Sequence, residues 1–371
     1  MTVKAGDIFM LVESLAPLDL AESWDNCGLQ LGCRDKEVKS ILVALDIDRA
    51  AVDAACRLKA DLVISHHPLF FKGVDCIDFG QNQGQLIRDL IQHDITVYSA
   101  HTNLDSAPQG LNEYLAGKFE LQNIRPLGSI KKEELLKLVV YVPLTHIEEV
   151  RAAICEAGAG HIGNYSDCSF RVRGTGTFRP LDGTSPYLGS AGVLEEVEEY
   201  RLETVIPKRV LKAVVSKMIE VHPYEEVAYD LFSLAIDGAA FSYGRVGELA
   251  RPVKLETLAC KVKKTLGLGA LRYIGGEDTM ITRVAVVSGA GASMISEAIR
   301  EECDVLITGD IKYHEAKAAA DSGLCLIDAE HDGLELAVEE LLADKLQASV
   351  KKMGWKIRIN RLYARPIFSH L

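Results

Sequence analysis

The sequence predicts an α/β fold in which a discontinuous outer α/β domain, with a mostly parallel sheet, is interrupted by an inserted ferredoxin-like α+β domain. Residues 1–127 alternate helical and strand patterns, residues 128–235 follow a different order of elements, and the alternation resumes in residues 236–371. Alternating strands and helices indicate βαβ units around a largely parallel sheet. We therefore expect residues 1–127 and 236–371 to form the outer domain and residues 128–235 to form the insert.

The first part of the outer domain consists of short apolar runs separated by helical patterns. Apolar residues at every third or fourth position indicate a helix, whereas a short continuous apolar run indicates a buried strand. Helices are expected at residues 8–16, 49–58 and 84–93, and strands at residues 40–46, 61–65 and 95–100.

The middle of the chain is expected to follow the order β, α, β, β, α, β, which is typical of a ferredoxin-like unit. Its strands are expected at residues 135–143, 169–178, 201–207 and 229–234, and its helices at residues 145–157 and 208–219. Residues 174–190 are rich in Gly, Thr, Ser and Pro, which favours a loop. The acidic run at residues 195–199 is interpreted as a solvated face.

The α/β alternation resumes after the insert. Helices are expected at residues 255–266, 293–301, 314–321 and 333–351, and strands at residues 283–288, 304–308 and 324–328. All the ligand candidates described below lie outside residues 128–235, so a shared site requires that the outer domain be discontinuous.

Composition narrows the classes of function. The formal net charge of −12 argues against nucleic acid or an anionic membrane as the default partner. No apolar run approaches the roughly 18 residues of a membrane span, and the first residues lack the pattern of a signal peptide. The nine cysteines show no Cys-x-x-Cys spacing. We therefore expect reduced thiols and a cytoplasmic location.

Histidines follow several of the expected strands. His66 and His67 come after the run at residues 61–65, His101 after residues 95–100, and His331 shortly after residues 324–328. Asp46 ends another expected strand. Because the carboxyl ends of parallel strands share one edge, and ligands bind there, these side chains are expected to meet.

Two of the histidines have a carboxylate four residues later. The pairs are His101 with Asp105 and His331 with Glu335, and residues at i and i+4 share one face of a helix. Each pair alone is also consistent with an acidic residue in the first turn of a helix. His66 and His67 alone are consistent with two surface histidines. Together, four imidazoles and two carboxylates are enough for two divalent ions, and they suit zinc, iron or manganese.

Three further segments are candidates for the pocket. Asp310 and His314 are also four residues apart. They are candidates for orienting a metal ligand or for moving protons. The alternative is that Asp310 caps a helix and His314 is half exposed. The loop Ser288–Ser293 resembles a phosphate-binding turn but lacks the full fingerprint, so a turn without a ligand is favoured. Asp25 is a candidate for lining the pocket.

Several of these segments together resemble the NGG-interacting-factor-three-like family, whose members are described as GTP cyclohydrolase I type 2 homologues. The resemblance covers essentially the whole chain. In the outer domain it rests on Ser23–Leu29, Ser65–Leu69, Ala100–Asp105, Gly244–Glu248, Gly309–His314 and Asp328–Glu335, and in the insert on Gly174–Pro180 and His222–Asp230.

The resemblance implies a dimetal centre held by the six residues singled out above. It also implies that the insert has the PII/CutA-type fold and that the protein forms a ring-shaped homohexamer. The six implied ligands are His66, His67, His101, Asp105, His331 and Glu335.

The sequence thus leads to the hypothesis of a binuclear metal-dependent hydrolase with a small-molecule substrate. The resemblance implies that this substrate is a nucleotide, GTP, attacked at C8 of its guanine ring. His314 and Asp25 are the candidates for moving protons. The alternative is a metal-binding ring-shaped scaffold or regulatory sensor without hydrolase activity. An open coordination position would distinguish a catalytic site from a structural one.

Overall fold

The computed structural model describes residues 2–128 and 131–370, and it divides the chain into two compact units. The outer unit comprises Met1–Ile130 and Phe241–Leu371, and the inserted unit comprises Lys131–Ala240. The α/β class that the sequence predicts is confirmed. Residues 129 and 130, at the start of the predicted insert, lie outside the described residues. No helix of the described residues is long and apolar enough to cross a membrane.

The outer unit contains two sheets, whereas the sequence predicts one mostly parallel sheet. The five-stranded sheet has the order β1-β4-β3-β2-β15, and all its pairings except β1 with β4 are parallel. Its strands are β1 (Gly28–Leu31), β2 (Ser40–Ala44), β3 (Leu62–Ser65), β4 (Thr96–Ser99) and β15 (Arg358–Arg361). Every residue of β2, β3 and β4 is buried, as expected for parallel strands that are covered on both faces.

The six-stranded sheet has the order β11-β14-β13-β12-β10-β5, with parallel pairing only among β12, β13 and β14. Alternation along the chain shows that strands exist but not which strands pair, so the sequence could not distinguish one sheet from two. The strands are β5 (Gln122–Pro126), β10 (Gly244–Lys254), β11 (Arg272–Ile274), β12 (Met280–Val287), β13 (Val305–Thr308) and β14 (Cys325–Asp328).

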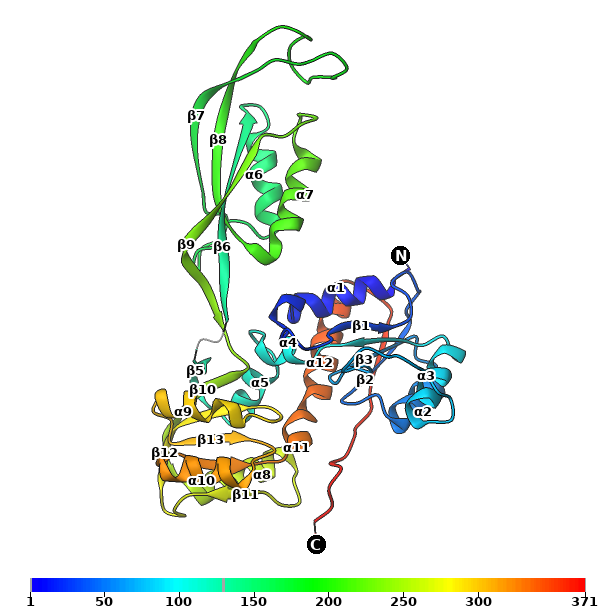
Figure 1. Cartoon of the computed structure of the whole chain (residues 1–371), viewed down its shortest axis with the longest axis vertical. Coiled ribbons are helices and arrows are strands. Elements are labelled where there is room, and N and C mark those ends of the chain that lie inside the picture. The colour runs from blue at the N-terminus through cyan, green and yellow to red at the C-terminus, as the bar shows by residue number, and fades with distance from the viewer. Residues whose placement is uncertain (1, 129–130, 371) are drawn as a thin grey trace. The chain divides into compact units, whose positions relative to one another are not determined.

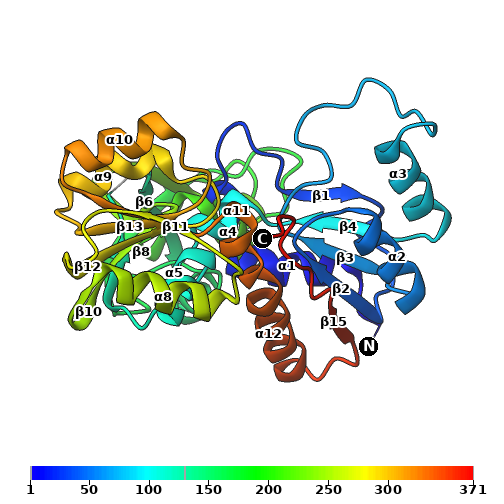
Figure 2. The same cartoon turned by 90° about the horizontal axis from the view of Figure 1, so that it is seen from below.

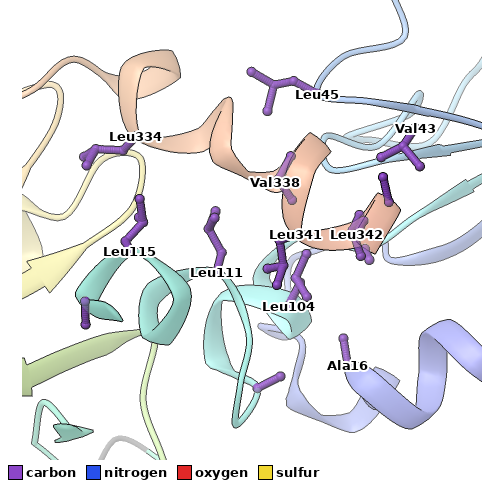
Figure 3. Close-up of a cluster of buried hydrophobic side chains, with 14 of the residues drawn as sticks. Ala16, Val43, Leu45, Leu104, Leu111, Leu115, Leu334, Val338, Leu341 and Leu342 are labelled. Carbon is purple, nitrogen blue, oxygen red and sulfur yellow. The ribbon is translucent and has the colours of Figure 1, made fainter. Parts of the chain in front are cut away.

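The two parts of the outer unit exchange strands. β5 precedes the insert but pairs with β10 of the second sheet, and β15 at the end of the chain pairs with β2 of the first. The two sheets also share one hydrophobic core. Figure 3 shows part of it, where Leu104, Leu111 and Leu115 face Leu334 and Val338. This sharing fixes the two sheets relative to each other.

The helices of the outer unit flank both sheets (Figure 1). α2 shows how local sequence sets a boundary, because the Asp48 side chain accepts a hydrogen bond from the Ala51 N–H at the helix start. The helices are α1 (Ala5–Leu15), α2 (Arg49–Leu58), α3 (Asn82–Gln92), α4 (Thr102–Ser106), α5 (Leu111–Lys118), α8 (Leu255–Leu266), α9 (Ile295–Arg300), α10 (Tyr313–Asp321), α11 (His331–Glu335) and α12 (Ala337–Lys352). The single helix expected at residues 333–351 is therefore divided into α11 and α12.

The inserted unit has one four-stranded sheet, in the order β7-β8-β6-β9, and two helices. Its hydrophobic core is separate from that of the outer unit. The elements are β6 (Lys131–Pro143), α6 (Ile147–Glu156), β7 (Ser169–Phe178), β8 (Glu195–Pro207), α7 (Leu211–Val221) and β9 (Tyr229–Phe241).

We predict that residues 131–240 can be replaced by a short Gly-Ser linker without unfolding the outer unit. The two ends of the insert are close together, because Lys132 and Asp237 form an ion pair of 2.6 Å. Circular dichroism should show cooperative thermal unfolding of the shortened chain. Loss of cooperative unfolding would mean that the outer unit depends on the insert for its stability.

Candidate metal centre

The six side chains that the sequence predicts as ligands lie together in the outer unit. Two of them follow β3 of the five-stranded sheet, two belong to α4 and its N-cap after β4, and two belong to α11 after β14 of the six-stranded sheet. Figure 2 shows α4 and α11 between the two sheets. In chain order the residues are His66, His67, His101, Asp105, His331 and Glu335.

The donor atoms form two overlapping groups. One ligand atom from each of His66, His67 and His101 lies within 4.8 Å of the others, and the same holds for His67, His331 and Glu335. His67 belongs to both groups, so the groups are adjacent. Two adjacent groups of imidazole and carboxylate donors are compatible with two neighbouring metal ions.

Each of the four imidazoles is held through Nδ1. Carbonyl and carboxylate oxygens only accept hydrogen bonds, so each Nδ1 carries the hydrogen, and Nε2 of the neutral ring keeps its lone pair. The acceptors are the Ala100 carbonyl for His66 (2.8 Å), Asp46 for His67 (2.7 Å), Asp25 for His101 (2.9 Å) and Asp310 for His331 (2.8 Å). Metal-binding histidines in proteins are oriented in this way.

Two buried atoms in the cluster lack hydrogen-bond partners. Nε2 of His66 lies 3.7 Å from Oδ1 of Asp105 and 3.9 Å from Oε1 of Glu335, too far for a hydrogen bond. Oε2 of Glu335 lies 2.9 Å from Nε2 of His67 without forming a hydrogen bond of good geometry. Buried polar atoms are rarely left without a partner. A cation that accepts lone pairs from both atoms fits the residues present.

The pKa values of the cluster shift in different directions, depending on whether burial or a neighbouring charge dominates at each side chain. Burial lowers the pKa of His66 to about 3, so this imidazole is neutral. Burial also disfavours the charge on His67, but Asp46 and Glu335 outweigh it and raise its pKa to about 10. Burial, followed by the nearby charge of Glu335, raises the pKa of Asp105 above its usual range. Asp105 and Glu335 are two buried carboxylates that lie within 4 Å of the same imidazole nitrogen, and such a pair favours a bound proton or a cation nearby.

Asp105 is positioned by contacts that the sequence analysis did not identify. Ser288 donates a hydrogen bond of 2.9 Å to Oδ1 of Asp105, and Asn112 accepts one of 2.6 Å from the Ser288 N–H. Arg245 is buried and donates to the carbonyls of Ser106 and Ala107, which end α4. These contacts connect α4 to β10 and to the loop after β12. They link residues more than a hundred positions apart, so no local pattern could indicate them.

The loop Ser288–Ser293 packs against the cluster, whereas the sequence predicts a turn that takes no part in the site. Gly289 has a φ of +58°, and a Cβ atom there would collide with Oε1 of Glu335. Glycine is therefore required for the loop to approach the cluster.

Asp25 orients His101 and has no exposed side-chain surface. Burial disfavours its ionisation, but hydrogen bonds from His101, Thr102 and Cys27 outweigh this and hold its pKa well below the usual range. A carboxylate with so low a pKa is a poor proton acceptor near neutral pH. These facts favour an orienting role for Asp25 over the proton transfer that the sequence predicts.

His314 lies on the first turn of α10 with an exposed side chain. Its ring packs edge-on against Tyr313, and it is not among the residues that line the cavity at the cluster. Its neighbour in the motif, Asp310, holds His331. The structure thus gives the orienting role in this motif to Asp310 and gives no support to a proton shuttle at His314.

The cluster opens into a cavity of about 560 Å³. Trp24 and Phe71 line it, with ring centroids 6.2 Å and 5.8 Å from that of His101, and both side chains are more than half exposed. Tyr243 and Ser293 add hydroxyl groups. No lysine or arginine is among the lining residues that the structure describes.

The fold and this cluster define an α/β protein with a histidine and carboxylate site suited to metal ions. The family model described as "Duf34/NIF3 (NGG1p interacting factor 3)" matches residues 3–366. The chain therefore belongs to this family.

Relatives of similar length support the assignment. A Bacillus subtilis protein named "GTP cyclohydrolase 1 type 2 homolog" is 41% identical over 367 residues, covering 98% of each chain. A Halalkalibacterium halodurans protein with the same name is 41% identical over 345 residues, covering 91% of this chain and 93% of its own. The crystal structure of a Bacillus cereus protein related to NIF3 superposes with a TM-score of 0.91 at 39% identity, covering 100% of both chains.

We predict that Asp46→Ala weakens metal binding about 10- to 100-fold, because His67 loses the acceptor that orients its ring. Asp46 is 55% exposed, so the substitution should not unfold the protein. In metal-free protein the pKa of His67 should also fall, since one of the groups that raise it is removed. Competition with a chelator measures the affinity, and a histidine NMR titration measures the pKa.

Asp35→Ala is the matched control, because Asp35 is 81% exposed and pairs with Lys4 instead of a histidine of the cluster. Equal metal affinity for Asp46→Ala and Asp35→Ala would contradict an orienting role for Asp46.

Proposed function

We propose that the protein is a hydrolase that depends on two divalent metal ions and acts on a nucleotide. The observation that carries the proposal is the set of four imidazoles fixed through Nδ1, three of which line a cavity together with two buried carboxylates. The six residues named above would hold the ions. Bound divalent cations supply hydroxide at neutral pH and stabilise developing negative charge.

The residues of the chain supply orientation and binding. Asp25, Asp46 and Asp310 fix three of the four imidazoles before any ion binds, which reduces reorganisation on binding. The cavity volume of about 560 Å³ is within the range of pockets that bind nucleotide-sized ligands. Trp24 and Phe71 offer aromatic faces on which a purine ring can stack.

The names of the relatives support GTP as the substrate. The reaction would then be addition of water at C8 of the guanine ring, followed by opening of the five-membered ring. Tyr243 and Ser293 are the hydroxyl groups placed to bind the substrate from the cavity wall.

A second function, a metal-binding scaffold or sensor, is favoured by one observation. Among the described lining residues there is no lysine or arginine to meet a triphosphate. In this alternative the metal ions stabilise the fold of a scaffold, or their binding regulates a sensor, and the protein turns over no substrate.

We predict that the metal-loaded protein converts GTP to a ring-opened product and that Glu335→Gln lowers kcat/KM by about 100-fold or more, together with loss of metal. Trp24→Ala should keep its metal and raise KM, because it removes only a stacking surface. Chromatography of nucleotides measures turnover, and elemental analysis measures metal.

Tyr165→Phe is the control, because Tyr165 is an exposed residue of the inserted unit and its substitution should change neither metal content nor turnover. A protein that carries two ions per chain but turns over neither GTP nor other nucleotides would contradict the hydrolase and support the scaffold.

A further inference from the structure

The inserted unit contains a cavity of its own, of about 400 Å³, and none of the six cluster residues lines it. Aromatic side chains from separate elements line it: Tyr141 of β6, Phe178 of β7, Tyr187 of the loop before β8, and Tyr224 after α7. The ring of Tyr224 lies 5.9 Å from that of Phe178 and 6.2 Å from that of Tyr187, centroid to centroid. The cavity therefore has aromatic walls on more than one side.

A carboxylate lies among these rings. Glu199 of β8 lines the cavity and is only 7% exposed. The Tyr224 hydroxyl donates a hydrogen bond of 2.8 Å to Oε1 of Glu199. Burial, and then this hydrogen bond, raises the pKa of Tyr224, so the phenol keeps its proton and remains a donor. Side chains alternate between the two faces of β8, and Glu199 points inward. The acidic run at residues 195–199, which the sequence predicts to be solvated, is therefore buried at this position.

The neighbouring strand leaves space for this carboxylate. Gly176 of β7 lies beside Glu199, and a Cβ atom at Gly176 would collide with Oε2 of Glu199. A buried charge is costly unless it is paired. Among the described residues Glu199 has no ion pair with a lysine, arginine or histidine, so the cavity provides a carboxylate without its counter-ion.

The charges around the cavity have the same sign. Glu225 and Glu226 also line it, and Glu225 is held in place by hydrogen bonds of 3.1 and 3.2 Å from the Ser185 N–H. Arg179 is the basic residue among the described lining residues, and it donates to the Gly192 carbonyl at 2.8 Å. Three carboxylates against one guanidinium disfavour an anion such as phosphate.

We propose that this cavity binds a small organic ammonium ion, with the alkylated nitrogen between the aromatic rings and next to the Glu199 carboxylate. Aromatic faces attract such cations, and the attraction is strongest where water is excluded. A metal ion is disfavoured because aromatic rings are not its ligands and a single carboxylate lies in the cavity's interior. A neutral aromatic ligand would leave the buried carboxylate uncompensated. The proposal is independent of the proposed hydrolase.

Isothermal titration calorimetry on the full chain tests the proposal with tetramethylammonium chloride as the probe. The neutral analogue neopentyl alcohol and the neutral aromatic benzyl alcohol are the comparison ligands. We expect saturable binding of tetramethylammonium and weaker binding of both neutral ligands by about tenfold or more.

Two variants locate the binding. Glu199→Gln keeps an acceptor for Tyr224 but removes the charge, and it should weaken tetramethylammonium binding about tenfold or more. Gly176→Ala should weaken binding as well, because it displaces the carboxylate. Glu196→Gln is the matched control: it makes the same substitution on β8, at an exposed position on the opposite face of the strand, and should not change binding.

Thermal unfolding of each variant confirms that it is folded. Absence of saturable tetramethylammonium binding would overturn the proposal, as would equal binding of the neutral analogue. Equal affinity of Glu199→Gln and the unmodified chain would also overturn it, and tighter binding of benzyl alcohol would assign the cavity to a neutral aromatic ligand instead.

Discussion

The orientation of four imidazole rings is the constraint on which the candidate site depends. A histidine can present either ring nitrogen, and the acceptor at Nδ1 decides which one. The acceptors here come from three aspartates and one main-chain carbonyl, and they leave Nε2 as the free nitrogen of each ring in the two overlapping groups of donors. The fold therefore selects one tautomer for each neutral ring, and the cluster is organised before a ligand arrives.

This organisation requires that the two sheets be held firmly together, because each sheet supplies part of the cluster. β5 and β15 cross between the two parts of the outer unit, and a common apolar core fills the space between the sheets (Figure 3). Arg245 and Asn112 add polar contacts that connect α4 to the second sheet and its loops. A small shift of one sheet would move Glu335 away from His67, so the strand exchange serves the site as well as the stability of the fold.

Much of the site could be predicted from the sequence because its side chains follow strand ends. His66, His67 and His101 come directly after short apolar runs, and strand ends converge wherever parallel strands share a sheet. What could not be predicted depends on pairing between distant segments. The sequence could not show that the strands form two sheets, or that Ser288 holds Asp105 across the core. The spacing of four from Asp310 predicts a role for His314, but His314 at the start of α10 has an exposed side chain, while Asp310 contacts the cluster.

The cluster of four imidazoles and two carboxylates is proposed to bind two metal ions. Crystals of protein produced in metal-replete medium, with diffraction data collected above and below the absorption edges of zinc, iron and manganese, test it most directly. We expect two anomalous peaks in the outer unit, one within coordination distance of His66, His67 or His101 and the other within coordination distance of His331 and Glu335. Ordered side chains at all of these residues without an anomalous peak between them would contradict the account.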